Sequence, residues 1–190
     1  MAILDNPQED LNTAEVSFMP TAQKWGLYLA AATVILTILI SIVGFDFSSM
    51  KSMAIYGVVA GLSGLATIIV CGVAVIREHR TNLGGFIDFK QAFLVCFVAF
   101  LIGTVISSGF NFVYNTYINP SFMDGMRESM NNMFDEANVP EVARADAFKS
   151  IDDARTISGT FMTFLKSTVF MAIMAAIMAG IMKKARPMFG

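Results

Sequence analysis

Long uninterrupted runs of apolar residues, separated by short polar stretches, dominate this chain. Four runs exceed the roughly 18 residues that a helix needs to cross a bilayer. They predict membrane-spanning helices at about 24–45, 53–76, 91–114 and 159–182. The alternating segments of about 10 residues that are typical of a membrane β-barrel are missing. The predicted fold class is an all-α integral membrane protein, with four transmembrane helices in one bundle and a single domain over residues 1–190.

Composition and charge refine this prediction. Hydrophobic residues make up 55% of the chain and charged residues only 15%, against about 25% charged in a typical soluble domain. The acidic tail, residues 1–21, lacks the basic start of a signal peptide, so we expect the first span to be an uncleaved anchor. Basic residues flank the ends of spans at Lys24, Arg77, Arg80 and Lys183. Their bias predicts a multi-pass membrane protein with both termini cytoplasmic.

The polar stretch at residues 77–93 separates the second and third predicted spans. We interpret it as a cytoplasmic hairpin, in which His79, the only histidine, is a solvated residue at a basic helix end. Acid–base and nucleophilic catalysis usually pair a His with a carboxylate or a nucleophile, and no HExxH, Walker A or GxSxG pattern occurs. We therefore expect no enzymatic activity, no cofactor and no nucleic-acid partner.

Small residues recur at helical spacing in two of the predicted spans. Gly57 and Gly61 in the second span, and Ala172, Ala176 and Gly180 in the fourth, predict faces along which helices approach closely. Such a face serves either packing within the bundle or a dimer. The expected partners are the lipid bilayer and either a second copy of the chain or another membrane protein.

A polar stripe marks the third span, where Gly103, Ser107, Asn111 and Asn115 lie four residues apart on one helix face. Polar residues inside a membrane usually hydrogen-bond a neighbouring helix, and a pore or a pocket for a lipid headgroup is the sharper alternative. Lys166 lies inside the fourth span. It either extends its ammonium to the lipid interface or joins the stripe in binding an anionic headgroup.

The segment at residues 119–158 predicts two helices on the extracytoplasmic side of the bundle. Asn119 and Pro120 read as the cap and first residue of the first helix. The second helix is expected to begin near Pro140 and to run directly into the fourth span. The first helix carries a methionine stripe, and thioether pairs of this kind also suit Cu(I): Met123, Met126, Met130 and Met133.

Two motifs carry a family resemblance. Residues 84–93 read GGFIDFKQAF, with Gly84, Gly85, Phe86, Phe89 and Phe93 as the motif positions, and residues 114–123 read YNTYINPSFM around Asn119-Pro120. Both resemble, in order and position, the motifs of a bacterial four-span membrane family of unknown function, DUF4199. The resemblance implies an inner-membrane protein and supplies no catalytic residue. It also implies a partner, because members appear beside a polyprenol-phosphate-type glycosyltransferase.

These observations lead to three functional expectations. The first is a non-enzymatic accessory or scaffold subunit of an envelope-associated membrane complex, with that glycosyltransferase as its possible partner. The alternative is a small lipid or solute translocator that uses the polar stripe of the third span. A minor alternative is a copper-handling protein that uses the methionine stripe.

Overall fold

The computed structural model describes residues 16–43, 50–153 and 155–184. Within these residues the chain is almost entirely helical. The helices are α1 (Met19–Val43), α2 (Met50–Asn82), α3 (Phe89–Val113), α4 (Pro120–Glu136), α5 (Glu141–Asp153) and α6 (Ile157–Met182). A π-helical turn, Tyr114–Ile118, extends α3. The predicted all-α fold with four long apolar helices packed together is confirmed.

Four of these helices, α1, α2, α3 and α6, are long and apolar enough to cross a membrane, so the protein is a multi-pass membrane protein. The helices extend beyond the predicted spans. α2 continues through Arg77 and Arg80 to Asn82, and the expected hairpin over residues 77–93 shortens to residues 83–88 between α2 and α3. The prediction was wrong here because polarity limits burial in lipid, whereas backbone hydrogen bonding lets a helix continue into water.

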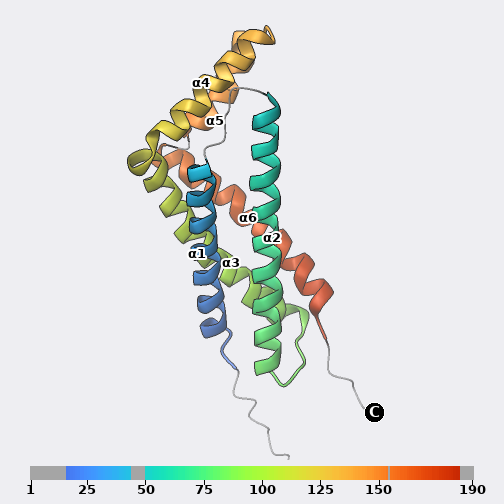
Figure 1. Ribbon diagram of the computed structural model, residues 1–190. Helices are drawn as coiled ribbons and strands as arrows, with labels where there is room; N and C mark the ends of the chain where they lie inside the picture. The colour runs from blue at the N-terminus through green and yellow to red at the C-terminus, as the bar shows by residue number, and fades with distance from the viewer. Residues whose placement is uncertain (1–15, 44–49, 154, 185–190) are drawn as a thin grey trace, which may run out of the picture.

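The two ends of the bundle differ in what they carry (Figure 1). The start of α1, the 83–88 connection and the end of α6 lie together, and we name this the hairpin end. α4 and α5 lie at the opposite end, which we name the cap end. An antiparallel β-bridge between Ile87 and Lys184 joins the connection to the residues that follow α6. Most of the acidic tail lies outside the described residues.

The hairpin half of the bundle holds the packed core, to which all four helices and the connection contribute. Its buried residues include Ala22, Leu29, Val75, Ile76, Ile87, Val95, Cys96, Phe100, Ala175, Met178 and Ala179. His79 belongs to the same face of α2 as Val75 and Ile76, and only 2% of its surface is exposed. The expectation that His79 is solvated was therefore wrong: the helix continues past it and turns it inward.

Close helix contacts occur at other small residues than those predicted. A Cβ atom at Gly26 would lie 2.8 Å from the carbonyl oxygen of Ala99, and one at Gly72 would lie 2.5 Å from Met178. Gly57, Gly61 and Gly180 have open space around them within the described structure. The interpretation that Gly57 and Gly61 pack inside the bundle was therefore wrong, and their use in a dimer stays a prediction.

The small residues of α6 that pack into the bundle are also not the predicted ones. Ala175 and Ala179 are fully buried, whereas Ala172 and Ala176 are only half-buried and Gly180 is exposed. Both sets of residues have the same helical spacing. The sequence therefore indicates that α6 has a small-residue face, but not which of the two faces meets the bundle.

At the cap end, α4 and α5 form a helical pair held by ion pairs. Arg127 pairs with Asp152, and Arg144 pairs with Asp135. α5 does not run into α6 as expected, because the chain turns at residues 155 and 156 and the Thr156 hydroxyl accepts a hydrogen bond from the Gly159 backbone amide at the start of α6. Arg155, within this turn, pairs with Asp124 of α4 at 2.8 Å.

Candidate functional site

A cavity of about 340 Å³ lies between α1, α2, α3 and α6. It begins near the middle of the bundle, at Gly64 on α2 and Gly103 on α3, and extends toward the cap end, where Asn115 and Thr160 line it. Its volume falls in the range of about 300–1,000 Å³ that is usual for ligand pockets. The hairpin-half core lies beyond its inner end. The cavity is therefore a pocket in the cap half of the bundle.

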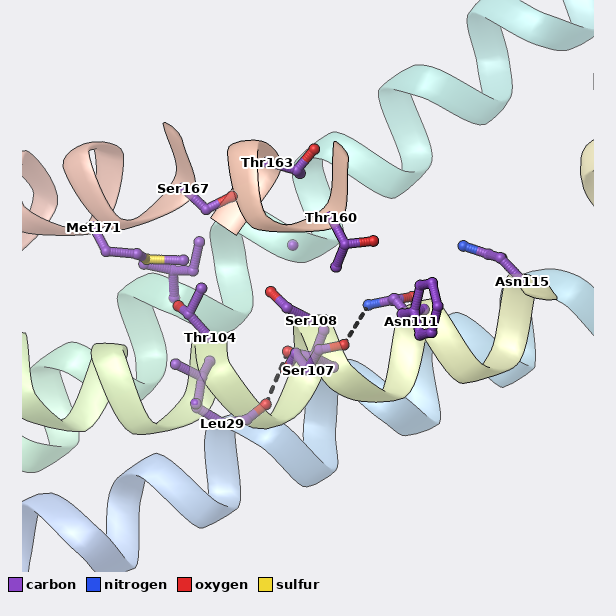
Figure 2. Close-up of a pocket in the computed structure, with 15 residues that line it drawn as sticks. Leu29, Thr104, Ser107, Ser108, Asn111, Asn115, Thr160, Thr163, Ser167 and Met171 are labelled. Carbon is purple, nitrogen blue, oxygen red and sulfur yellow. Dashed lines mark hydrogen bonds between the residues drawn. The ribbon is translucent and has the colours of Figure 1, made fainter. Parts of the chain in front are cut away.

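The predicted polar stripe of the third span lines this cavity. Gly103, Ser107, Asn111 and Asn115 are all among its lining residues. Figure 2 shows Ser108 and Asn111 of α3 facing Thr160 and Ser167 of α6 across the open space. The amide of Asn111 donates one hydrogen bond, 2.9 Å long, to the Ser107 carbonyl oxygen of its own helix. Within the described structure, the side-chain oxygen of Asn111 accepts no hydrogen bond from the protein.

Several other polar groups of the cavity also have no protein partner. Among the described residues, no hydrogen bond is made by the side chains of Ser107, Ser108, Asn115, Thr160, Thr163 and Ser167. By contrast, the hydroxyls of Thr33 and Thr104 each bond to a carbonyl oxygen one helical turn earlier, at 2.8 Å and 2.7 Å. The cavity wall thus presents free donors and acceptors from α3 and α6.

Helix geometry explains this placement. Close contact at Gly103, where an added Cβ would lie 2.7 Å from Leu29, brings α1 against α3 near the middle of the bundle. The stripe then continues toward the cap end on the same face of α3, and the π-helical turn carries Asn115. π-Helical turns occur frequently at functional sites. Here the turn extends the polar wall by one more amide.

The sequence prediction missed the opposite wall and misplaced the lysine. Thr160, Thr163 and Ser167 line the cavity from α6, and their spacing of three and four residues is the signal that could have revealed them. Lys166 is exposed and is absent from the cavity lining. The structure thus brings four of the five predicted ligand-binding residues together and leaves Lys166 apart from them.

The comparison with known proteins identifies the family. A family model described as a protein of unknown function (DUF4199) matches residues 24–184. The chain belongs to this family. No curated protein and no solved structure matches it. The match spans both motifs, the cavity and the cap.

In this DUF4199 protein the first family motif builds the hairpin end. Gly84 and Gly85 adopt φ angles of +77° and +94°, a region that side-chain-bearing residues avoid. Ile87 is buried and pairs with Lys184. The Asp88 carboxylate caps α3 by accepting a hydrogen bond from the Gln91 backbone amide at 2.7 Å. The motif therefore turns the chain, anchors it and starts α3.

The aromatic residues of this motif lie at the hairpin end, with Phe86 in the 83–88 connection and Phe89 and Phe93 in the first turns of α3. Phe89 and Phe93 stack with their ring centres 6.2 Å apart, and Phe86 lies beneath the Lys184 ammonium at 5.6 Å. Phe89 is exposed on the bundle surface. These contacts surround the hairpin and do not reach the cavity.

The second family motif forms the junction between α3 and α4. Pro120 is the first residue of α4, and Asn119 precedes it, as expected. The Asn119 side chain does not cap the helix; it bonds to the Tyr114 hydroxyl at 3.4 Å and accepts from Ser121 at 2.9 Å. This motif therefore fixes the turn next to Asn115 at the cavity.

The methionine stripe lies on α4, away from the cavity. Met123 is buried, and Met126, Met130 and Met133 are half-buried. Within the described residues, no group of three or more His, Cys, Asp or Glu side chains is arranged to hold a metal. Thioether binding of copper stays a hypothesis.

Proposed function

We propose that this protein is a non-enzymatic membrane protein that binds the polar part of a lipid, or a small polar solute, in the cavity between α1, α2, α3 and α6. The observation that carries the proposal is the set of unpaired polar side chains that face one another from α3 and α6. Translocation of the bound group is the activity that such a cavity would serve.

Energetics support binding over a purely structural role. An unsatisfied polar group inside a bilayer costs several kcal/mol, so side chains of this kind usually hydrogen-bond a neighbouring helix. The stripe of α3 does not reach such partners on α6. Water or a ligand must therefore satisfy Ser108, Asn111 and Ser167 in the membrane. A wall of hydroxyl and amide groups can both donate to and accept from a bound polar molecule.

The experiment replaces Asn111 by Leu in the full-length protein. We expect the variant to fold and insert as the wild type does, because the lost side chain makes only one hydrogen bond, within its own helix. We expect translocation of a headgroup-labelled lipid in proteoliposomes to fall to background. Val70→Leu, at a residue of α2 that is 65% exposed and does not line the cavity, is the control and should leave transport unchanged.

Two outcomes would contradict this proposal. Unchanged translocation in the Asn111→Leu protein would show that the cavity is not needed for the function. Loss of the folded protein would instead make the stripe a structural contact between helices. Size-exclusion chromatography in mild detergent separates the two results.

A second candidate function is that of an accessory subunit, and the cap favours it. α4 and α5 extend beyond the bundle (Figure 1), and Val142 on α5 is 81% exposed. We propose that this helical pair docks a membrane enzyme that acts on lipid-linked substrates, with a polyprenol-phosphate glycosyltransferase as the expected partner. Purification from the native cell in mild detergent should then yield a stoichiometric complex that Val142→Glu disrupts. A homogeneous particle without that enzyme would contradict docking.

We also propose that the hairpin end faces the cytoplasm of a bacterial cell, in its inner membrane. Lys24, Arg77, Arg80 and Lys183 gather at this end of the bundle, and such residues favour the cytoplasmic side. The cap would then be extracytoplasmic. Alkaline phosphatase fused after residue 184 should be inactive, and the same enzyme inserted at Asn138 should be active; the reverse pattern would overturn this orientation.

A further inference from the structure

A second hollow adjoins the polar cavity on the outside of the bundle. It is a groove of about 290 Å³ between the cap halves of α3 and α6. Its wall is mostly apolar, and Val105, Phe161 and Phe164 line it together with Gly109. The cavity and the groove share three lining residues, Ser108, Phe112 and Thr160. One molecule could therefore occupy both.

We propose that the ligand of this protein is a lipid with an uncharged, hydroxyl-rich headgroup, whose headgroup occupies the cavity while one hydrocarbon chain lies in the α3–α6 groove. This inference rests on the proposed function and names its substrate class. It follows from the chemistry of the two compartments and from the wall that they share.

The charge of the headgroup follows from the lining. Neither the cavity nor the groove has a Lys, Arg, His, Asp or Glu among its lining residues. A phosphate or ammonium group buried there would lose its hydration without gaining a counter-charge, which is strongly unfavourable. Lys166, the one cation within α6, is exposed and lines neither hollow. The lining of the cavity therefore favours an uncharged headgroup over a charged one.

The hydroxyl-rich character follows from the free side chains. Ser and Thr hydroxyls each offer one donor and two acceptor positions, and an Asn amide offers both kinds. Ser108 and Asn111 on α3 face Thr160 and Ser167 on α6 (Figure 2), so donors and acceptors meet a ligand from two sides. Sugar or glycerol hydroxyls, which also donate and accept, match such a wall.

The hydrocarbon chain of the proposed lipid is inferred from the groove. The side chains of Val105 and Phe161 are 53% and 57% exposed at the surface of the bundle, where lipid surrounds them. The groove therefore takes a hydrocarbon chain. Because the groove adjoins the cavity at Ser108, Phe112 and Thr160, we assign that hydrocarbon chain to the same lipid molecule. A soluble sugar would fill the cavity and leave the groove to bulk lipid.

The test measures binding to the purified full-length protein in mild detergent, by native mass spectrometry and competition. The probes are glucosyl-diacylglycerol, phosphatidylglycerol with the same acyl chains, and glucose. We expect glucosyl-diacylglycerol to bind at least about ten-fold more tightly than either of the others. Asn111→Leu should weaken its binding by about ten-fold, as expected for one lost hydrogen-bonding group.

The groove is tested by Gly109→Leu. A Cβ atom at Gly109 meets no other atom within 4 Å, so the substitution fills the groove without disturbing the fold. We expect it to weaken binding of glucosyl-diacylglycerol by about ten-fold and to leave any binding of glucose unchanged. Gly180→Leu, another exposed helical glycine with open space around it, is the matched control and should bind as the wild type does.

The outcomes separate this inference from the proposed function. If glucose binds as tightly as the glycolipid and Gly109→Leu has no effect, the groove does not bind a hydrocarbon chain, whereas binding in the polar cavity is still supported. If phosphatidylglycerol binds as tightly, the uncharged headgroup is overturned. If no probe binds and Asn111→Leu changes nothing in binding or translocation, the proposed function fails as well.

Discussion

The hairpin half and the cap half of this bundle are built from the same four helices, yet they pack differently. In α2, none of residues 51–70 is buried, whereas Val75, Ile76 and His79 are. α6 shows the same division, with no buried residue between 160 and 174. The helices converge at one end on a dense apolar core and enclose a polar cavity at the other. One half holds the structure together, and the other is available for binding.

The difference arises from where small residues and polar residues meet. In the hairpin half, Gly26 and Gly72 let neighbouring helices touch, and the facing side chains are apolar. In the cap half, Gly64 and Gly109 have open space around them; Gly64 lines the polar cavity and Gly109 lines the groove. Small residues produce close packing only where a neighbouring helix supplies a complementary apolar surface.

The largest expected difference between the halves is in access to water. Ser108→Cys should react completely with a small, charged thiol reagent that cannot cross the membrane, because this residue lines the cavity. The native Cys71 and Cys96 are buried in the hairpin half and should remain unmodified over the same time. Mass spectrometry of the labelled protein measures both. Adding Asn111→Leu should slow the reaction, and equal labelling of all three cysteines would contradict a dense hairpin half.

The next largest effect is on stability. Gly26→Leu would place a Cβ atom 2.8 Å from the backbone oxygen of Ala99, which the structure cannot relieve by rotating a side chain. We expect it to destabilise the protein by about 3 kcal/mol. The same change at Gly64, where space is open, should stay within about 0.5 kcal/mol of the wild type.

A thiol-reactive fluorophore provides the stability measurement during heating or denaturation. Cys71 and Cys96 become reactive only when the hairpin half opens, so the signal reports that half directly. Similar losses in the Gly26→Leu and Gly64→Leu proteins would show that the cap half is packed as tightly as the hairpin half.

A smaller effect is expected at the turns. Gly85 has a φ angle of +94° at the hairpin end, so Gly85→Ala should destabilise the protein by about 1–2 kcal/mol. At the cap end, Asn138 takes a φ angle of +50° between α4 and α5, and asparagine tolerates this region. Asn138→Gly should therefore change stability by less than about 0.5 kcal/mol. Denaturant titration of both variants checks the contrast.

The smallest effect is expected where α1 meets α2 at the hairpin end. The Glu78 carboxylate accepts hydrogen bonds from the Trp25 indole at 2.8 Å and from the Lys24 ammonium at 2.9 Å. Glu78→Gln keeps an acceptor for Trp25 and removes only the charge. Because exposed ion pairs contribute little and are screened by salt, we expect a slight fall in the unfolding temperature at low salt and none at high salt. A large fall would make this pair part of the core.

The two functional proposals depend on different halves of the molecule. Ligand binding depends on the cavity in the cap half, and docking depends on α4 and α5 above it. A double variant that carries Asn111→Leu and Val142→Glu should therefore show the sum of the two defects, since distant sites act independently. The family motifs, by contrast, fix the two connections, at Gly84-Gly85 and at Asn119-Pro120.

Much of the site could be predicted from one helix at a time. The four-residue spacing of Gly103, Ser107, Asn111 and Asn115 put them on one face, and that face lines the cavity. The same reasoning could not place Lys166, because a lysine between Thr163 and Ser167 lies on a neighbouring face whose direction depends on the rotation of α6. Nor could it show that His79 is buried, since its neighbours in sequence, Glu78 and Arg80, are charged.

The sequence alone determined the four apolar helices, the two-helix cap and the polar stripe, because hydrophobic length and helical periodicity are local properties of the chain. Only the tertiary structure decided which small residues touch, that Ala175 and Ala179 face inward in place of Ala172 and Ala176, and that α3 and α6 enclose a cavity. Those outcomes depend on how each helix rotates and tilts against its neighbours. Rotation and tilt are set by the fit between all four helices together, which no single apolar run encodes.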